Sequence, residues 1–461
     1  MILSLGLALA ASGCAAGPDY RAPQSATLGV PDEYYRAQGE TPSEQQLANW
    51  WTVLGDATLN GLIEQAINAN LDIAQAQARL RQARAALVQS RAAYLPNVTG
   101  SASSGRNFDS DRGDSSSYAI GADAAWEIDL FGGVRRSVEA ARADAAASYY
   151  DLASVRTAII AETVTNYIQA RLAQERLRIA RDALQYQSDN FDIAGWRTQA
   201  GLTSSLDEES ARAQRAQTAA TIPSLDAGYR AALNRIAVLT GQAPGGATAA
   251  LEQAAPIPVA PDTLVTGIPA DTLRQRPDVR SAERQLAAQT ARIGVAKANL
   301  LPSLQISGNV GTSALSLGKL TDIVTGGLFA SIAQVIFDGG ARAAEVRAQR
   351  AATDGAFSAY KKTVLSALED VENALSAVQS ARGRSEQFAI AFDAANNSAL
   401  LARSQYQAGL TDFQTLLTAE QSLLSASDGR ANAKADEALA VAQLYSALGG
   451  GWQTMDQNTH E

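Results

Sequence analysis

The chain has 461 residues, a net charge of −9 at neutral pH and only 18% charged residues. This acidic balance excludes a nucleic-acid-binding protein, because such a protein needs a basic face. The sequence holds one cysteine and one histidine. These counts exclude an internal disulfide, a histidine-based metal site and a His-dependent catalytic triad, and they leave a carboxylate-only active site open. Our expectation is a chain with no catalytic residues, no metal and no bound cofactor.

The first residues resemble a bacterial lipoprotein signal. Residues 1–13 are apolar or small, and they end in the box Ala11-Ser12-Gly13-Cys14. We expect residues 1–13 to be removed as a signal peptide. Cys14 is then expected to carry diacylglycerol and an N-acyl chain such as palmitate, which anchor a protein more firmly than one acyl chain. The alternative is a secretory signal with an incidental cysteine. Ala15, in place of Asp, favours sorting to the outer membrane.

Residues 14–56 are predicted to form a lipid-anchored, largely extended segment. Pro18, Pro23 and Pro31 prevent a helix at its start. Further along, Trp50-Trp51 and the distant Trp452 indicate small packed elements in the middle of the molecule. Anchoring of these tryptophans at a membrane interface is the alternative.

The chain carries two copies of one large unit. A Leu-Pro pair, a Phe-Gly-Gly or Phe-Asp-Gly-Gly element and an Ala-Gly-Leu-Thr element occur twice in the same order. The offset is 206 residues from Leu95 to Leu301 and 208 residues from Gly201 to Gly409. A solenoid repeat has roughly 20–50 residues. We therefore expect two similar halves of one fold.

Each half is predicted to begin with a helix and a β-hairpin. In the first half, residues 57–94 place apolar side chains at helical spacing, and Pro96 ends the helix. Residues 97–131 then predict a weak strand, a polar loop and a returning strand. From Tyr118 to Leu130, apolar or aromatic residues alternate with small or acidic ones. One face suits lipid and the other water, which is typical of an outer-membrane barrel strand. An edge hairpin on a soluble sheet is the alternative.

The second half offers a matching hairpin over residues 303–337. Its first strand alternates clearly, whereas residues 328–337 carry apolar side chains on both faces. Two hairpins give four strands, and known barrels begin at about eight. Open strand edges are not tolerated in lipid. If these strands span a membrane, several chains must therefore build one barrel.

A long proline-free helix is predicted after each hairpin, over residues 133–200 and 340–408. A helix of about 65 residues spans roughly 100 Å. Gly201 and Gly409 suit the residue that follows a helix C-terminus. A shorter helix then returns antiparallel, so we expect coiled-coil hairpins that pack on neighbouring hairpins.

A segment with five prolines, residues 242–269, separates the two copies. The chain therefore divides into a signal peptide, an anchored segment with equatorial elements, the first repeat, the linker, the second repeat and a tail: 1–13, 14–56, 57–241, 242–269, 270–450 and 451–461.

Several stretches resemble the outer-membrane efflux proteins of the TolC/OprM/NodT type, and the resemblance covers essentially the whole chain. The matching residues are Gly17-Pro18-Asp19-Tyr20, Ile268-Pro269, Arg276 to Leu286, Arg292 to Ala298, Leu301-Pro302 and Phe337-Asp338-Gly339-Gly340. The resemblance implies an α+β membrane protein with a TolC-like fold. A homotrimer of such chains forms a twelve-stranded β-barrel in the outer membrane, continuous with a periplasmic barrel of long α-helical coiled coils.

The same resemblance implies a passive exit duct of a tripartite efflux pump, which exports drugs or other small toxic compounds. The implied partners are a periplasmic adaptor (membrane fusion) protein, an inner-membrane resistance-nodulation-division pump and outer-membrane lipid. A channel for type I protein secretion is one alternative. Another is a lipid-anchored periplasmic coiled-coil scaffold without a pore, which predicts no strands. An enzyme is disfavoured, because neither a Gly-x-Ser-x-Gly element nor a complete P-loop occurs.

The resemblance also implies a gate at the periplasmic end, just past the two glycine turns. By position, Asp207 matches an acidic member of the family's hydrogen-bond network and Tyr406 matches its tyrosine. Thr411 stands where some members have Arg. Thr415 and Thr418 stand where some members have the aspartates that ring the pore.

The usual aspartate ring is therefore missing at its usual positions. We expect a constriction lined by threonine or made apolar by Leu416 and Leu417. Asp412 and Glu420 are candidate substitutes for the ring charge, although Glu420 lies about 200° around the helix from Thr418. In the first hairpin, the alternative role of Asp207 and of the candidate aperture charge Glu208 is to compensate the partial charge at a helix N-terminus.

Overall fold

A computed structural model describes residues 15–31, 44–108, 114–261 and 275–453. The protein is an α+β chain that combines long helices with one four-stranded antiparallel sheet. The chain forms two compact units. The sheet unit comprises residues 1–24, 77–151 and 278–363, and the helical unit comprises residues 25–76, 152–277 and 364–461.

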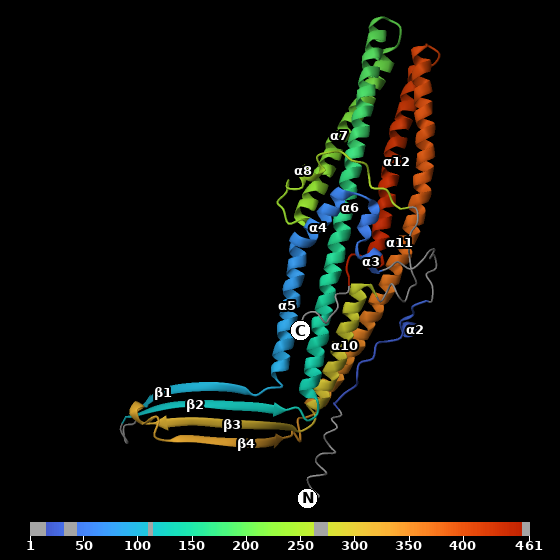
Figure 1. Ribbon diagram of the computed structural model, residues 1–461. Coiled ribbons are helices and arrows are strands. Elements are labelled where there is room, and N and C mark those ends of the chain that lie inside the picture. Colours follow the sequence, from blue (N-terminus) through green and yellow to red (C-terminus); the bar gives the residue numbers. More distant parts are fainter. Residues whose placement is uncertain (1–14, 32–43, 109–113, 262–274, 454–461) are drawn as a thin grey trace. The chain divides into compact units, whose positions relative to one another are not determined.

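The four strands lie side by side in chain order, and every neighbouring pair is antiparallel (Figure 1). They are β1 (Asn97–Asn107), β2 (Ser115–Ile128), β3 (Ser303–Ala314) and β4 (Val324–Ala333). The two predicted hairpins are confirmed, and the pairing of β2 with β3 joins the two copies. The predicted position of the last strand, 328–337, is wrong. Pairing of Val324 with Thr312 and of Ala333 with Ser303 sets its limits instead.

The long helical hairpins repeat with equal lengths. Helices α6 (Gly133–Gln199) and α11 (Ala341–Gln407) have 67 residues each, and α7 (Ser205–Leu239) and α12 (Phe413–Ala447) have 35 each. At the turns, Gly201 and Gly409 adopt φ of 72° and 71°. The amide that follows each glycine donates back to a carbonyl five residues earlier, at 2.9 Å and 2.8 Å. This is the left-handed helix end that glycine accommodates best.

The predicted single helix over residues 57–94 is wrong, because Asn70 divides it into α4 (Ala57–Ala69) and α5 (Leu71–Ala92). The backbone of Asn70 is extended, with ψ of 133°. Its Oδ1 accepts the backbone N–H groups of Asp72 and Ile73 at 2.9 Å and 3.1 Å. Its Nδ2 donates to the carbonyl of Leu239 at 3.0 Å. The amide thus begins the second helix and ties it to the end of α7.

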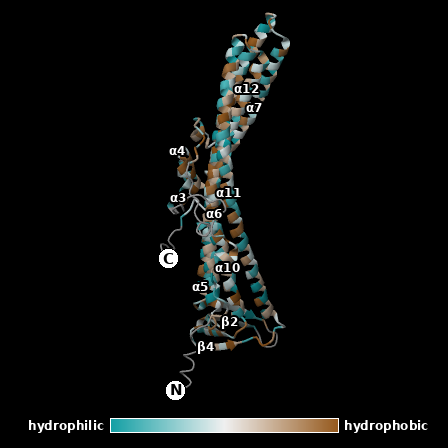
Figure 2. Cartoon of the chain, turned by 90° about the vertical axis from the view of Figure 1, so that its right-hand side faces the viewer, coloured by the Kyte–Doolittle hydropathy of each residue, from teal (hydrophilic) through white to brown (hydrophobic). Residues whose placement is uncertain are grey.

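The remaining helices are short, apart from α10 (Pro277–Ala298). They are α2 (Ser25–Leu28), α3 (Glu44–Ala48), η1 (Trp50–Leu54), α8 (Thr248–Leu251) and η2 (Leu317–Lys319). Figure 2 shows hydrophilic and hydrophobic residues mixed along the long helices. Among the described residues, no helix combines the length and the apolar character that a membrane crossing requires.

The largest core among the described residues lies in the helical unit and includes Trp50 and Trp51. Trp50 is fully buried and stacks on Tyr445 with ring centroids 5.8 Å apart. Trp51 and Trp452 are also buried, and Trp452 Nε1 donates to the carbonyl of Gln275 at 3.1 Å. Leu251, in α8 of the inter-repeat linker, is fully buried in the same core. The predicted packing role of these tryptophans is confirmed.

In the sheet unit, the segment from Ala15 to Tyr20 is held against α6 and α10. Arg136 of α6 is almost fully buried, and it donates to the carbonyl of Ala16 at 3.2 Å and to Asp19 at 2.6 Å. Tyr20 donates to Glu283 at 2.8 Å. The expected extended conformation is therefore confirmed for residues 15–24. The expectation that Pro23 and Pro31 exclude a helix is wrong between them, because Ser25–Leu28 form the one-turn helix α2.

Candidate functional site

The strand register gives the sheet one apolar face and one largely polar face. Trp126 pairs with Ile306, and Ile306 pairs with Ala330, so alternate residues of neighbouring strands share a face. The opposite face carries mostly Ser, Thr, Asn, Gln, Asp and Glu, with Phe329 as its one large apolar member among the described strand residues. The large apolar side chains of the first face are Val98, Ile120, Trp126, Ile128, Leu304, Ile306, Val310, Val324, Leu328 and Ile332.

This apolar face is open in a single chain. Ile120 is 54% exposed, Leu328 is 80% exposed and Ile332 is 71% exposed. Contiguous apolar surface of this kind marks an interaction with lipid or with another protein. Strands β1 and β4 each pair with one neighbour only, so each leaves an edge open within the described chain. Contact with lipid would cover the apolar face, and strands from other chains would pair with the open edges of β1 and β4.

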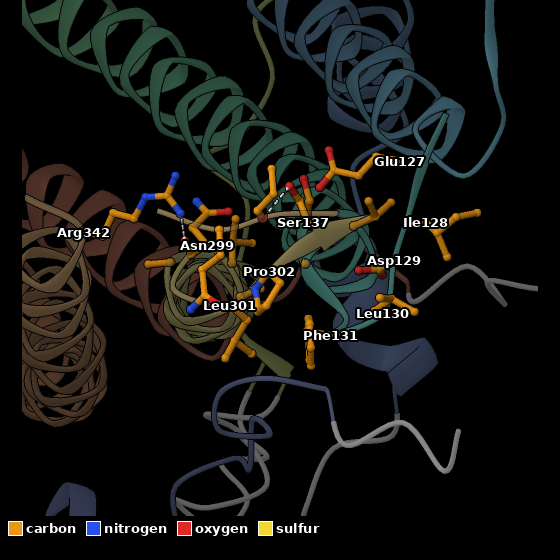
Figure 3. A pocket seen from close by; sticks show the side chains of 18 of the residues that line it. Glu127, Ile128, Asp129, Leu130, Phe131, Ser137, Asn299, Leu301, Pro302 and Arg342 are labelled. Atoms are coloured by element: carbon orange, nitrogen blue, oxygen red, sulfur yellow. Dashed lines mark hydrogen bonds between the residues drawn. The ribbon is translucent and has the colours of Figure 1, made fainter. Parts of the chain in front are cut away.

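A cavity of about 590 Å³ lies where the sheet meets the helices of its own unit. Figure 3 shows Glu127 and Asp129 on one side of it and Asn299 and Arg342 on the other. Asp129 accepts the backbone N–H of Arg135 at 2.8 Å, and Arg342 donates to the carbonyl of Asn299. The cavity therefore has charged and polar side chains where the polar face of the sheet ends. Asp129 and Arg342 form hydrogen bonds to the backbone at the junctions between strands and helices.

At the first helical turn, the acidic side chains have local partners. Ser204 begins α7 by accepting the N–H of Leu206 at 3.0 Å. Asp207 accepts a hydrogen bond from the hydroxyl of Thr203, one turn earlier. Asp207 and Glu208 both lie in the first turn of α7, where negative charge is favourable. The structure therefore gives Asp207 a role within its own turn, alongside any role toward a neighbouring chain.

At the second turn, Asp412 begins α12 by accepting the N–H of Thr415 at 2.7 Å. The hydrogen bonds from the Thr415 hydroxyl and amide lower the pKa of Asp412 below its usual 3.8. Thr415 and Thr418 are exposed, and Thr411 is half-buried. Of the predicted aperture residues, the two exposed threonines thus remain available to a pore, whereas the carboxylate of Asp412 holds the helix start.

Tyr406, Leu416 and Leu417 are buried in a core between the two hairpins. The ring of Tyr406 lies 5.4 Å from that of Phe413, and the guanidinium of Arg197 lies over it at 5.0 Å. Leu416 and Leu417 are 1% and 4% exposed. The predicted apolar constriction made by these two leucines is therefore corrected: both side chains hold α12 in place and cannot face a pore.

Glu420 is likewise buried, at 7% exposure, and is not a pore-facing charge. Its Oε2 accepts from Asn190 of α6 at 2.5 Å, and its Oε1 accepts from Arg403 of α11 at 3.1 Å. The Arg403 guanidinium lies 4.6 Å from the ring centre of Tyr186. Burial raises the pKa of the Glu420 carboxyl, although Arg403 and Asn190 act in the opposite direction. One carboxylate thus links three helices.

Sequence reasoning missed Asn190 and Arg403, which complete this link. Asn190 lies 230 residues from Glu420, so no local spacing connects them. The available signal was the rotation of Glu420 away from the exposed Thr418, which already placed this carboxylate on the inner side of α12. A buried carboxylate needs partners. Here Arg403 comes from α11 of the same hairpin, and Asn190 comes from α6 of the other hairpin.

Cys14, the predicted lipid attachment site, lies outside the described residues, as does the single histidine, His460. Among the residues that the structure does describe, no group of three or more His, Cys, Asp or Glu side chains lies close enough together to hold a metal ion.

Comparisons with known proteins agree with the duplication. The family described as "Outer membrane efflux protein" matches residues 62–242 and 268–450, one match for each copy. The chain is 30% identical over 448 residues to Nodulation protein T of Rhizobium leguminosarum bv. trifolii, covering 96% of this chain and 95% of the relative.

Solved structures share the fold. The outer-membrane channel OprN is 36% identical, with a TM-score of 0.84, and the match covers 95% of this chain and 100% of that one. The open state of the MtrE outer membrane channel of Neisseria gonorrhoeae is 26% identical, with a TM-score of 0.86, covering 95% of this chain and 98% of that one.

Proposed function

We propose, from the premise that this chain belongs to the outer membrane efflux protein family, that three copies of it form one duct across the periplasm and the outer membrane. As a family member, the chain is an outer-membrane component of an efflux system with a TolC-like channel fold. It is a passive channel protein and not an enzyme.

The observation that carries the trimeric duct is the two-faced sheet with open edges. An apolar face suits lipid, a polar face suits a water-filled interior, and three sheets joined edge to edge leave no open edge. The non-pore scaffold is disfavoured, since it predicts no strands at all. Each 67-residue helix spans about 100 Å, which suits a tunnel that continues into the periplasm.

A substitution pair tests the assignment of the two faces. Leu328→Arg places a charge on the apolar face, and Ser307→Arg places the same charge on the polar face. Arginine facing the middle of a bilayer costs about 2–4 kcal/mol. We therefore expect Leu328→Arg to reduce the heat-modifiable, trypsin-resistant trimer in outer-membrane fractions. Ser307→Arg should assemble and change single-channel conductance. Equal assembly of both variants would reject the duct.

We further propose that the duct works with a periplasmic adaptor and a resistance-nodulation-division pump to export drugs or other small toxic compounds. The expected consequence of deleting the chain is a lower minimum inhibitory concentration for at least one such compound, restored by the wild-type sequence. Unchanged resistance across a broad panel, together with loss of a secreted protein, would favour type I secretion instead.

Cys14 is proposed to carry the diacylglycerol and N-acyl chains that anchor the processed N-terminus. The contacts of Ala16 and Asp19 with buried Arg136 support this role, because they fix the segment just after Cys14 on the sheet unit. Intact-mass measurement of the purified protein should show the lipid mass, and Cys14→Ser should lack it. An unmodified wild-type mass at Cys14 would leave the channel proposal standing and reject the anchor.

The periplasmic aperture is proposed to be lined by Thr415 and Thr418, with Thr411 close by. Asp207 and Tyr406 are proposed to restrain neighbouring chains through their turns. In planar bilayers, Asp207→Ala and Tyr406→Phe should raise conductance or open probability, and Thr418→Lys should lower cation conductance. If the first two substitutions change neither quantity, the gating role is lost, while a response to Thr418→Lys would still place that residue in the pore.

A further inference from the structure

A small cavity in the helical unit, separate from the proposed aperture, has the features of a ligand site. Its volume is about 200 Å³, and α6, α11 and α12 each contribute to its wall. The wall is largely apolar, with Ile179, Ala183, Phe392, Leu423 and Leu424. A dry cavity of roughly 150 Å³ is large enough for benzene. This space therefore accepts one aromatic ring with a small substituent.

One wall residue has an unmet hydrogen-bonding need. Gln187 is 3% exposed, it lines the cavity, and its Oε1 has no hydrogen-bond partner among the described residues. Buried amides are nearly always paired, so an orphan of this kind needs an explanation. An amide offers an acceptor at one end and a donor at the other. The Oε1 atom itself has almost no accessible surface, so a ligand hydroxyl meets this amide by accepting from its Nε2, or by donating to Oε1 once the amide has rotated by half a turn.

The charges at the wall balance, which argues against an ionic ligand. Arg403 pairs with Glu420 at 3.1 Å, and Arg178 pairs with Asp182 at 2.7 Å. Each ion pair stays within the protein, so neither side chain offers an uncompensated charge to the cavity. Tyr186 is half-exposed at the rim, beneath the Arg403 guanidinium. The cavity therefore presents an apolar body, uncharged polar groups at Gln187, Asn396 and Ser427, and no net charge. The Ser427 hydroxyl already donates to the carbonyl of Leu423.

We propose that this cavity binds a small, neutral, single-ring aromatic molecule that carries a hydroxyl group, with the ring against Phe392 and Leu423 and the hydroxyl at the Gln187 amide. The ligand would contact all three helices that Glu420 links. Its occupancy would therefore stabilise the pairing of the two hairpins. The inference does not depend on the trimeric duct, since every residue involved belongs to one unit of one chain.

The test uses phenol and its isostere toluene as probes on the full-length protein in one detergent, with binding followed by saturation-transfer NMR. Wild type should bind phenol more tightly than toluene. Ala183→Leu fills the cavity and should weaken phenol binding at least tenfold. The matched Ala394→Leu, at an exposed position on α11 outside the wall, should bind like wild type. For a given probe, partition into detergent is the same for all variants and cancels when they are compared. Phenol and toluene partition differently, so their affinities are compared as free, non-micellar concentrations.

Gln187→Leu removes the hydrogen-bonding amide and leaves the size of the cavity nearly unchanged, so it tests the polar contact alone. It should weaken phenol binding about tenfold, the loss expected for one hydrogen bond, and leave toluene binding within about twofold. Because the substitution removes an unpaired buried amide, it should fold at least as well as wild type. Phenol binding that Ala183→Leu leaves unchanged, or that Gln187→Leu leaves equal to wild type, would overturn the proposal. So would absence of phenol binding, the result expected if water alone fills the cavity.

Discussion

The two helical turns are copies of one backbone that use charge in opposite ways. Both place glycine at φ near 70° between a 67-residue and a 35-residue helix. At the position eight residues after the N-cap, the first copy has Arg212 and the second has Glu420. The Arg212 side chain is 65% exposed and pairs with Glu209 on its own helix at 2.5 Å. Glu420 is buried and bonded to two other helices.

After the duplication, the two copies kept the same backbone but use the charged side chain at this position differently. The repeated helix lengths and glycine turns maintain the geometry of the hairpins, and they tolerate either charge at the surface. Only the second copy turns its charged side chain inward, where desolvation and pairing are strong. The stability of the hairpin pair should therefore depend on groups in the second copy and hardly at all on their counterparts in the first.

The largest effect is expected for Arg403→Met, which leaves Glu420 buried without its cation. Breaking a buried ion pair costs about 3 kcal/mol or more. The loss should be greatest at high pH and should shrink as the pH falls, because protonation of Glu420 removes the unpaired charge. Guanidinium unfolding followed by circular dichroism measures it.

Arg212→Met is the matched control for that experiment, because it removes the same side chain from an exposed pair on one helix. Such pairs contribute about 0–1 kcal/mol. Equal losses in the two variants would mean that burial of Glu420 has no energetic consequence.

A smaller effect is expected for Glu420→Gln, and it has a defined pH dependence. Burial raises the pKa of Glu420 above 4.5, so the folded protein binds this proton more tightly than the unfolded chain. The resulting stabilisation is complete below about pH 4.5 and is lost as the pH rises through the raised pKa. The stability of wild type relative to Glu420→Gln should therefore fall as the pH increases from 4 to 8. A stability difference between wild type and Glu420→Gln that stays constant or grows with pH would contradict a raised pKa of Glu420 in the folded protein.

The backbone conformation of these regions could be predicted from the sequence more accurately than their side-chain contacts. Proline-free runs and Gly201 or Gly409 predict the hairpins, because those signals are local. Asn70 was missed as a helix break since its partner, the carbonyl of Leu239, lies 169 residues away. The last strand was misplaced because residues 328–337 are apolar on both faces, and only pairing with β3 fixes its register.

The candidate site follows the same rule. Exposed Thr415 and Thr418 could be placed by their distance from Gly409. Burial of Leu416 and Leu417 could not, because it depends on contact with the other hairpin, including Ala194 and Ala211. If the strands span a membrane, their number predicts that several chains build one barrel. Which strand edges would meet between chains cannot be read from the sequence of one chain.

A more local effect is expected at the start of the first hairpin's second helix. Ser204→Ala removes the hydroxyl that accepts the Leu206 N–H, and loss of such a cap costs about 1 kcal/mol. The first turn of α7 should fray, seen as faster amide hydrogen exchange at Leu206. Ser205→Ala is the control, since that exposed serine is the first residue of the helix and is not its cap. Similar exchange in both variants would remove Ser204 from the capping role.

The smallest effect, and the one that separates the two caps, is expected for Asp412→Asn. Asparagine caps a helix about as well as aspartate, so little should change at neutral pH. The pKa of Asp412 is below 3.8 in the folded protein, so its contribution is present above that pH and is lost as the pH falls through the lowered value. On acidification, exchange at the Thr415 amide should therefore rise in wild type relative to the Asn variant at the same pH. The Leu206 amide serves as an internal reference, because its cap is the non-titrating Ser204. A parallel acid response at both amides would mean that the two turns share one pH-sensitive element, and the contrast between the copies would fail.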